Sequence, residues 1–247
     1  MNSKIKNNAE MIRFLGELKS RVIYALLFLS VIFAAFTFYA NQLYSFLAKP
    51  LLHYLPSGHL IATQIVSPFF VPFKLAFVAA LLVSMPFFLY QLWTFISPAL
   101  YGHEKKLIWP FLLCSVILFY TGLMFAYLVI FPMLFNFLAN TAPQGVQLSP
   151  DINEYLDFTT KLLLVFGCLF EIPMAMVLLV STNLVTRQKF LAMRGYAIVT
   201  AFILGMLLAP PDVLSQTILA VPIWLLYEAG LILCIFVSKA KREQKNS

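Results

Sequence analysis

Six apolar runs follow one another along the 247-residue chain, and most of them are about 20 residues long or longer. A helix rises about 1.5 Å per residue, so about 20 apolar residues cross the roughly 30 Å hydrocarbon layer of a bilayer. Only helices and closed barrels satisfy their backbone hydrogen bonds in lipid, and the chain lacks the strictly alternating segments typical of barrel strands. The pattern therefore predicts an all-α integral membrane protein.

The composition agrees with that prediction, because 62% of the residues are hydrophobic and only 11% are charged. We expect one polytopic membrane domain over residues 1–247, with six transmembrane helices in a bent, concave bundle. The predicted spans are 22–43, 69–96, 108–135, 156–181, 196–208 and 214–237. An even number of spans places both ends of the chain on the same side of the membrane.

The basic residues predict which side that is. Fourteen of the 17 Lys and Arg residues fall in the two tails and in the two loops that share their side, and only Lys49, Lys74 and Lys161 fall on the other side. Loops rich in Lys and Arg stay in the cytoplasm. We therefore expect both termini to be cytoplasmic, and the compact tails favour a bacterial cytoplasmic (inner) membrane. The net charge of +7 is then a topology signal, and no nucleic-acid partner is expected.

The fifth span is unusually short. Residues 196–208 form about 20 Å of helix before Pro210 and Pro211 end it, and this is about 10 Å less than the hydrocarbon layer requires. A short span is expected to thin the bilayer locally. Four prolines inside other spans are expected to bend their helices. They are Pro86, Pro132, Pro173 and Pro222. At the fourth span, Ser149 is the expected N-cap, followed by Pro150 and Asp151 in the first turn.

Four acidic residues are the candidates for chemistry. Glu171 and Glu228 lie within the fourth and sixth spans, where an ionised carboxylate is costly and must face protein or water, so a functional role is the first hypothesis. Glu17 precedes Arg21 by four residues, which predicts an ion pair on one helix face. Glu104 can complement the positive end of the third span. No histidine, cysteine or glycine pattern predicts an enzyme, a cofactor or a metal site.

Several short motifs follow one another along the chain. They are Phe14-Leu-Gly-Glu-Leu-Lys-Ser-Arg21, Ala48-Lys-Pro-Leu51, Ser67-Pro-Phe-Phe70, Tyr90-Gln-Leu-Trp93, Phe95-Ile-Ser-Pro-Ala-Leu-Tyr-Gly-His-Glu104, Phe119-Tyr-Thr-Gly122, Phe125-Ala-Tyr127, Phe166-Gly-Cys-Leu-Phe-Glu-Ile-Pro173 and Leu208-Ala-Pro-Pro-Asp-Val-Leu-Ser-Gln216. In this order they resemble the TatC family, the signal-receptor subunits of the twin-arginine protein translocase. The resemblance covers nearly the whole chain, although Phe14 and Lys19 replace a histidine and an arginine of the family's amino-terminal motif.

The resemblance implies that the chain binds signal peptides that carry two consecutive arginines and exports folded precursor proteins. Glu17 and Glu104 would bind the arginine pair, flanked by Phe95 and Leu100, and Glu171 would line a polar face of the bundle. Single-span partners of the TatA and TatB type would contact Met206, Leu207 and Gln216. Other copies of the chain are also expected partners, and the proton motive force would supply the energy. Structural roles are expected for Pro50, Arg21, Pro173 and Asp212.

Two other function classes compete with this hypothesis. A secondary transporter of a small solute would also use intramembrane carboxylates and broken helices, with Glu171 and Glu228 at its site. The chain lacks the internal repeat typical of such transporters. A structural scaffold is the third possibility, and in it the acidic residues would serve topology alone.

Overall fold

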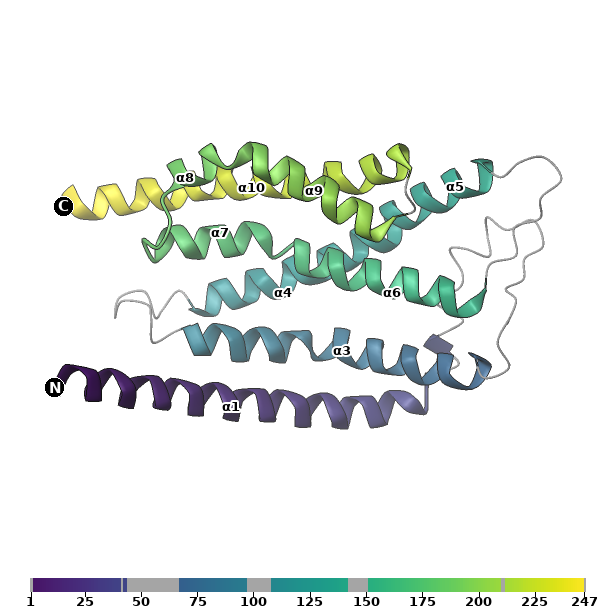
Figure 1. Cartoon of the computed structure of the whole chain (residues 1–247), viewed down its shortest axis with the longest axis horizontal. Coiled ribbons are helices and arrows are strands. Elements are labelled where there is room, and N and C mark those ends of the chain that lie inside the picture. Colours follow the sequence, from purple (N-terminus) through teal and green to yellow (C-terminus); the bar gives the residue numbers. More distant parts are fainter. Residues whose placement is uncertain are drawn as a thin grey trace. The chain divides into compact units, whose positions relative to one another are not determined.

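The computed structural model describes residues 2–40, 42–43, 67–96, 108–141, 151–209 and 212–246. These residues are helical almost throughout, which confirms the predicted all-α class (Figure 1). The helices are α1 (Asn2–Thr37), α3 (Ser67–Ile96), α4 (Ile108–Phe125), the π-helical turn η3 (Ala126–Ile130), α5 (Phe131–Thr141), α6 (Ile152–Leu169), α7 (Ile172–Ser181), α8 (Arg187–Ala192), α9 (Arg194–Leu208) and α10 (Val213–Asn246).

Five helical stretches of the described chain are long and apolar enough to cross a membrane. They are Gly16–Thr37, Phe70–Phe95, Trp109–Phe137, Ile152–Ser181 and Val213–Phe236. The remaining predicted span, the fifth at 196–208, corresponds to α9, whose 15 residues make a helix of about 22 Å. The short fifth span is therefore confirmed, while the thinning of the bilayer around it stays a prediction.

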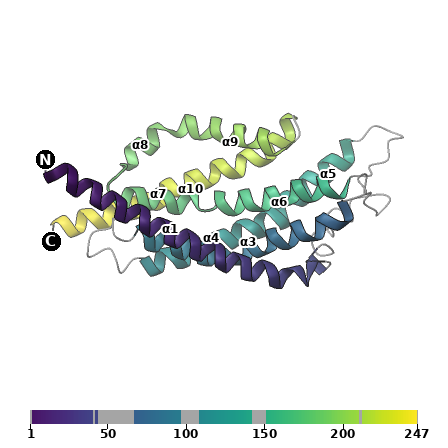
Figure 2. The same ribbon diagram turned by 60° about the horizontal axis from the view of Figure 1, so that its bottom comes forward.

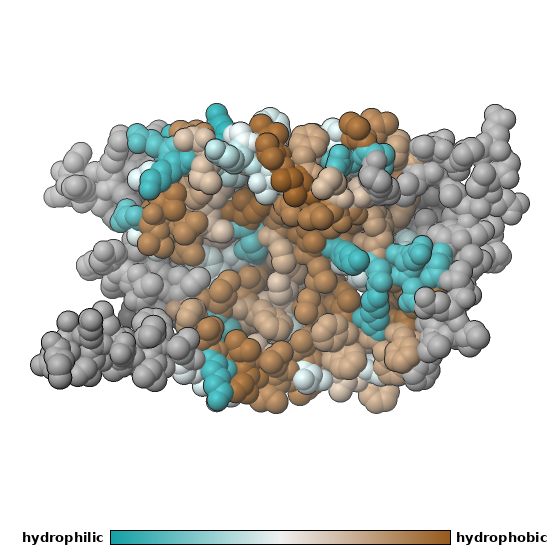
Figure 3. Space-filling model, in the orientation of Figure 1, coloured by the Kyte–Doolittle hydropathy of each residue, from teal (hydrophilic) through white to brown (hydrophobic). Residues whose placement is uncertain are grey.

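The helix surfaces suit a lipid environment. Many large apolar side chains are exposed, among them Phe38 at 87% and Val213 at 76%. Apolar side chains cover much of the described surface on the face that Figure 3 shows. Exposed apolar area on this scale is far beyond the patches of soluble monomers. The protein is accordingly a multi-pass membrane protein.

The first helix extends well beyond the span predicted for it. The apolar run predicted an approximate membrane span over 22–43, whereas the whole helix α1 begins at Asn2 and ends at Thr37. The polar N-terminal part contains Lys, Glu and Leu, which are good helix formers, and hydropathy alone does not detect it. The apolar part of α1, Gly16–Thr37, overlaps the predicted span, and the polar turns before it were not part of the prediction.

The N-cap predicted for the fourth span was also wrong. Asp151 has an extended backbone and is itself the N-cap, since its side chain accepts hydrogen bonds from the backbone N–H groups of Asn153 and Glu154. Helix α6 then begins at Ile152, four residues before the predicted span. Aspartate and serine cap helices about equally well, so the choice between two neighbouring candidates was open in the sequence. Ser149 and Pro150 lie outside the described residues.

Two of the four prolines coincide with irregular helix. Pro173 lies in the first turn of α7, directly after the break at Phe170 and Glu171 that separates α7 from α6. Proline has no N–H to continue the hydrogen-bond ladder, so the fourth span is divided there, as expected. Pro132 follows the π-helical turn, in which the N–H of Phe131 bonds to the carbonyl of Ala126. Helices α3 and α10 continue through Pro86 and Pro222.

The residue contacts define two compact units. Unit 1 contains Met1–Leu43 and Pro72–Val116, and unit 2 contains Tyr44–Val71 and Ile117–Ser247. Two of the boundaries between them fall inside helices, one in α3 after Val71 and one in α4 after Val116. Each unit is described by itself below, and the single domain expected from the sequence stays a prediction.

Aromatic side chains build much of the packing in unit 1. Phe28 of α1 stacks on Phe87 of α3, with ring centroids 4.6 Å apart. The buried Trp93 of α3 stacks on Phe111 of α4 at 5.4 Å, and its Nε1–H donates a 3.1 Å hydrogen bond to Oγ of the buried Ser115. An aromatic ring with a polar group therefore joins α3 to α4 by both packing and a hydrogen bond.

Replacing Trp93 by phenylalanine is expected to lower the free energy of unfolding by about 0.6–1.7 kcal/mol. The substitution keeps an aromatic ring but removes the donor to Ser115, and hydrogen bonds between membrane helices contribute about 0.6 kcal/mol on average and at most about 1.7. Unfolding in mixed micelles by added denaturing detergent measures the change. Trp109 is 73% exposed, so Trp109→Phe is the matched control and is expected to change little. Equal effects of the two substitutions would contradict the prediction.

Two glycines allow a close helix approach in unit 2. A Cβ built on Gly122 of α4 would lie 2.6 Å from the carbonyl oxygen of Phe166 in α6, and one on Gly167 of α6 would lie 2.6 Å from the ring of Phe119 in α4. Phe119 and Phe166 are both fully buried. Gly122 therefore lies against the backbone of α6 and Gly167 against the ring of Phe119, and the small residues set the distance between the two backbones.

Candidate functional site

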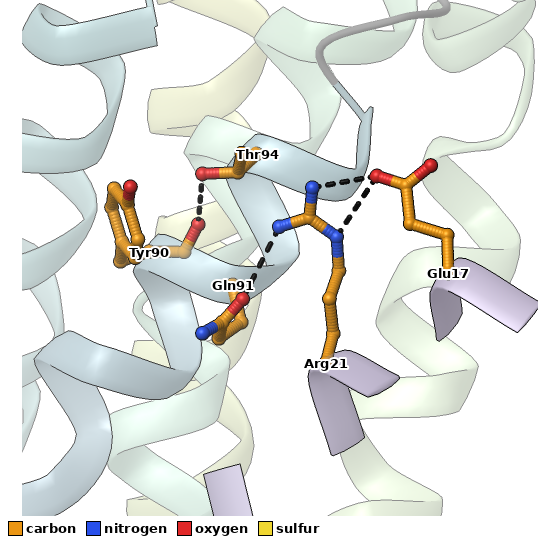
Figure 4. Close-up of polar contacts among 5 residues, drawn as sticks. All are labelled: Glu17, Arg21, Tyr90, Gln91 and Thr94. Carbon is orange, nitrogen blue, oxygen red and sulfur yellow. Dashed lines mark hydrogen bonds and ion pairs between the residues drawn. The ribbon is translucent and has the colours of Figure 1, made fainter. Parts of the chain in front are cut away.

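Glu17 and Arg21 form the predicted ion pair on α1. One carboxylate oxygen of Glu17, Oε1, accepts hydrogen bonds from both Nη2 and Nε of Arg21, at 2.6 and 3.1 Å. Nη1 of Arg21 donates a third bond, of 3.2 Å, to Oε1 of Gln91 in α3 (Figure 4). The Glu17 side chain is 35% exposed. Arg21 therefore connects the two helices and fixes the position of an accessible carboxylate.

An apolar groove of about 200 Å³ begins beside this ion pair. Leu18, Val22 and Leu26 of α1 form one wall, and Leu92 and Phe95 of α3 form the other. Arg21 and Gln91 also line it. Both helices belong to unit 1. The structure thus brings Phe95 and Arg21, two residues selected from the sequence, to one groove beside Glu17.

Three other selected residues cannot be placed. Glu104 and Leu100 fall in the segment 97–107, and Pro50 falls in the segment 44–66, both outside the described residues. Their roles stay predictions.

The intramembrane acid Glu171 lies at the break between α6 and α7. It is partly buried, its backbone N–H bonds to the carbonyl of Cys168, and its own carbonyl accepts from the N–H of Ala175. Pro173, two residues later, is buried and keeps the break in place. The predicted polar position in the middle of the fourth span is therefore an irregular point of the helix, where backbone and carboxylate polarity coincide.

The second intramembrane acid, Glu228 of α10, is paired with a residue that the sequence did not suggest. Nη2 of Arg194, at the start of α9, donates a 2.7 Å hydrogen bond to Oε2 of Glu228. The adjacent Tyr227 donates its hydroxyl proton to the carbonyl oxygen of Phe190 in α8, at 2.6 Å. These two contacts connect α8 and the start of α9 to α10 within unit 2. Figure 2 shows the α9 and α10 ribbons approaching each other toward the opposite end of α9.

The residues selected as partner contacts lie at the other end of the α9–α10 pair. Met206 and Leu207 are 54% and 72% exposed on α9. Gln216 of α10 is partly buried, and its carbonyl oxygen lies 3.0 Å from a Cβ built on Gly205. Asp212 caps α10, because its Oδ2 accepts a 2.7 Å hydrogen bond from the N–H of Ser215. The structural role expected of Asp212 has this physical basis.

Comparison with known proteins decides which family these features belong to. Residues 13–222 match the family model described as Sec-independent protein translocase protein (TatC). This chain belongs to the TatC family. The resemblance expected from the sequence motifs is confirmed.

TatC relatives and solved TatC structures agree over nearly the full length. The Sec-independent protein translocase protein TatC of Haemophilus influenzae is 46% identical over 235 residues, which cover 95% of this chain and 92% of that protein. The TatC of Escherichia coli K12 is 45% identical over 243 residues, covering 98% and 94%. A crystal structure of the twin-arginine translocase receptor TatC matches with a TM-score of 0.82 and 32% identity, over 91% of this chain and 99% of that one.

Sequence reasoning missed Gln91 and Arg194 as members of polar contacts. Gln91 lies within an apolar span, where a polar side chain needs a partner, so its position alone was a signal. Arg194 and Glu228 lie at nearly equal distances along the chain on either side of the turn at 209–212. In two antiparallel neighbouring helices such residues lie at the same depth, so this spacing predicts the pair.

Proposed function

We propose that the chain is the signal-receptor subunit of a twin-arginine protein translocase. It binds Arg-Arg signal peptides of folded precursors at the cytoplasmic face through Glu17 and Glu104. With partners of the TatA and TatB type it exports those precursors across a bacterial inner membrane, and both of its termini are cytoplasmic. Membership of the TatC family supports the role in protein export. The geometry of Glu17 supports the site.

The second carboxylate oxygen of Glu17 is the observation that carries this site. Arg21 occupies Oε1 alone, and among the described residues none bonds to the other oxygen, which points away from Arg21 (Figure 4). A guanidinium of an incoming peptide can therefore approach that oxygen without displacing Arg21. Before the peptide binds, Arg21 and Gln91 hold the Glu17 carboxylate in one orientation, which lowers the entropic cost of binding.

The chemistry of the two acids accounts for selectivity. A guanidinium group presents a planar fork that matches a carboxylate, whereas the ammonium group of lysine is a single point charge. Lysines and arginines are frequent in the two tails and the loops that would share the cytoplasmic side. Two acids on such a surface attract an arginine pair locally, while the surrounding lysines and arginines repel other basic segments, which favours selective docking.

The apolar groove beside Glu17 suits the residues that follow the arginines in a signal peptide. Its walls are leucine, valine and phenylalanine side chains of α1 and α3, including Phe95. Glu171, at the break in the fourth span, would act at a step after docking. The exposed Met206 and Leu207 of α9 would contact the single-span partners, with Gln216 beside them on α10.

The proposal is tested by crosslinking the loop that contains Glu104 to a signal peptide. A photoreactive residue at position 103 is expected to crosslink to a precursor with an Arg-Arg signal and about tenfold less to one with Lys-Lys. Glu17→Gln and Glu104→Gln are each expected to weaken the Arg-Arg crosslink, Glu104 more strongly. Glu171→Ala is expected to keep the crosslink and slow export, because Glu171 acts after docking.

The matched control for the acid substitutions is Glu154→Gln. Glu154 is an exposed acid in the first turn of α6, on the expected outer side of the membrane, so its loss changes net charge equally without touching the proposed site. Equal crosslinking to the Arg-Arg and Lys-Lys signals would contradict the proposal. So would a loss of crosslinking in Glu154→Gln as large as that in Glu104→Gln.

A further inference from the structure

A second apolar groove lies in unit 2, on the side of the short helix α9 that faces α7 and α10. Its volume is about 220 Å³, and apolar cavities of about 150 Å³ already bind molecules of the size of benzene. Ala197, Thr200 and Leu204 of α9 face Ile172 of α7 and Ile223 of α10 across it. Ala201 and Ile223 belong to the buried cluster that forms its floor. The groove runs along α9 for about three turns.

One end of this groove carries charge. Tyr227 closes the groove beside the Arg194–Glu228 ion pair, together with Phe190 and Met193. The Arg194 side chain remains 51% exposed although it is paired. Lys189, which precedes Phe190, is exposed, and its side chain has no hydrogen bond or ion pair with any residue that the structure describes.

The depth of this charged end follows from the antiparallel pairing of α9 and α10. Arg194 lies level with Glu228, whereas the apolar stretch of α10 continues to Phe236, about 12 Å farther along the helix. A half-exposed guanidinium therefore lies level with a part of α10 that is apolar enough to lie in the hydrocarbon layer. Because Glu228 neutralises only one positive charge, Arg194 and Lys189 together leave an excess of positive charge there.

We propose that this groove is a binding site for an anionic phospholipid. One acyl chain lies along Ala197, Thr200 and Leu204, and the phosphate group lies at the open end, where Lys189 and the exposed donors of Arg194 bind it. Basic pockets between membrane helices bind anionic headgroups in this way. A helix of a partner protein is the other candidate occupant, but nothing requires such a helix to carry a negative charge opposite Lys189 and Arg194. The charge at the groove end therefore favours the lipid.

Native mass spectrometry of the purified full chain in detergent tests the site, with dioleoyl phosphatidylglycerol and dioleoyl phosphatidylcholine as probes. The two lipids share their acyl chains and differ in headgroup charge. We expect one phosphatidylglycerol to remain bound and phosphatidylcholine to bind several-fold more weakly. Lys189→Gln is expected to lower phosphatidylglycerol binding about fivefold, the loss typical of one basic residue at an anionic surface. Glu228→Gln is expected to raise it, because it frees Arg194.

The acyl part of the site is tested separately by filling the groove. Ala197→Phe is expected to weaken both lipids, whereas Val199→Phe, at a 58% exposed position outside the groove, is the matched control and should change neither. Thermal unfolding of each variant verifies that it is folded. Equal binding of the two lipids, or insensitivity to both Lys189→Gln and Ala197→Phe, would overturn the proposal. So would crosslinking of position 197 to a single-span partner without any lipid preference, since the groove would then hold a protein helix.

Discussion

Replacing Gly122 by leucine is expected to abolish the folded protein, and replacing it by alanine is expected to lower the free energy of unfolding by about 1–3 kcal/mol. In an ordinary helix the change from glycine to alanine stabilises by up to about 1 kcal/mol. Here the added Cβ would lie 2.6 Å from the carbonyl oxygen of Phe166 and 2.9 Å from the ring of Phe170. The first of these neighbours is backbone, so α4 and α6 must separate to admit even one carbon.

The same chain offers a control for this prediction. Gly195, in α9 of the same unit, has no atom within 4 Å of its added Cβ. Gly195→Ala is therefore expected not to destabilise. Denaturing-detergent titration in micelles compares the two variants, and the yield of monodisperse protein on size exclusion reports the fate of Gly122→Leu. A Gly122→Ala protein as stable as the Gly195→Ala protein would show that the helices do not pack as closely as this in the membrane.

The helical architecture was predictable from the sequence because it depends on hydropathy and length. The third span illustrates this, since the prediction of 108–135 compares with the apolar stretch Trp109–Phe137. The predicted end of the fifth span, residue 208, is also the end of α9, because Pro210 and Pro211 follow it. Its predicted start differs from that of α9 by two residues. Pro173 was a reliable signal for the same reason: a missing N–H acts locally, whatever the surrounding packing.

Features that depend on tertiary contacts or on weak local preferences were harder to predict. The polar first turns of α1 carry no apolar signal, so the helix start at Asn2 was missed. The N-cap Asp151 was one residue type among several with equal preference. The Arg194–Glu228 pair joins residues 34 positions apart. It became predictable only when α9 and α10 were treated as an antiparallel pair with a common turn.

Exchanging the charges of Glu17 and Arg21 is expected to stop export. A merely structural ion pair would survive in the double variant Glu17→Arg with Arg21→Glu, because the two residues would still face each other one turn apart. Receptor chemistry would not survive, since the acid moves about 6 Å along α1 and an arginine replaces it at the binding position. Loss of charge-assisted hydrogen bonds is expected to weaken signal-peptide binding roughly 10- to 150-fold.

Export of a reporter with an Arg-Arg signal, measured beside the thermal stability of each variant, separates the two roles of Glu17. Glu17→Gln retains an amide oxygen that can accept from Arg21, so it is expected to keep most of the stability and lose most of the export. The exchange variant is expected to unfold near the temperature of the natural protein and to remain inactive. Recovery of export in the exchange variant would mean that Glu17 serves only to hold Arg21 against Gln91. The acidic contact for the signal peptide would then have to come from Glu104 alone.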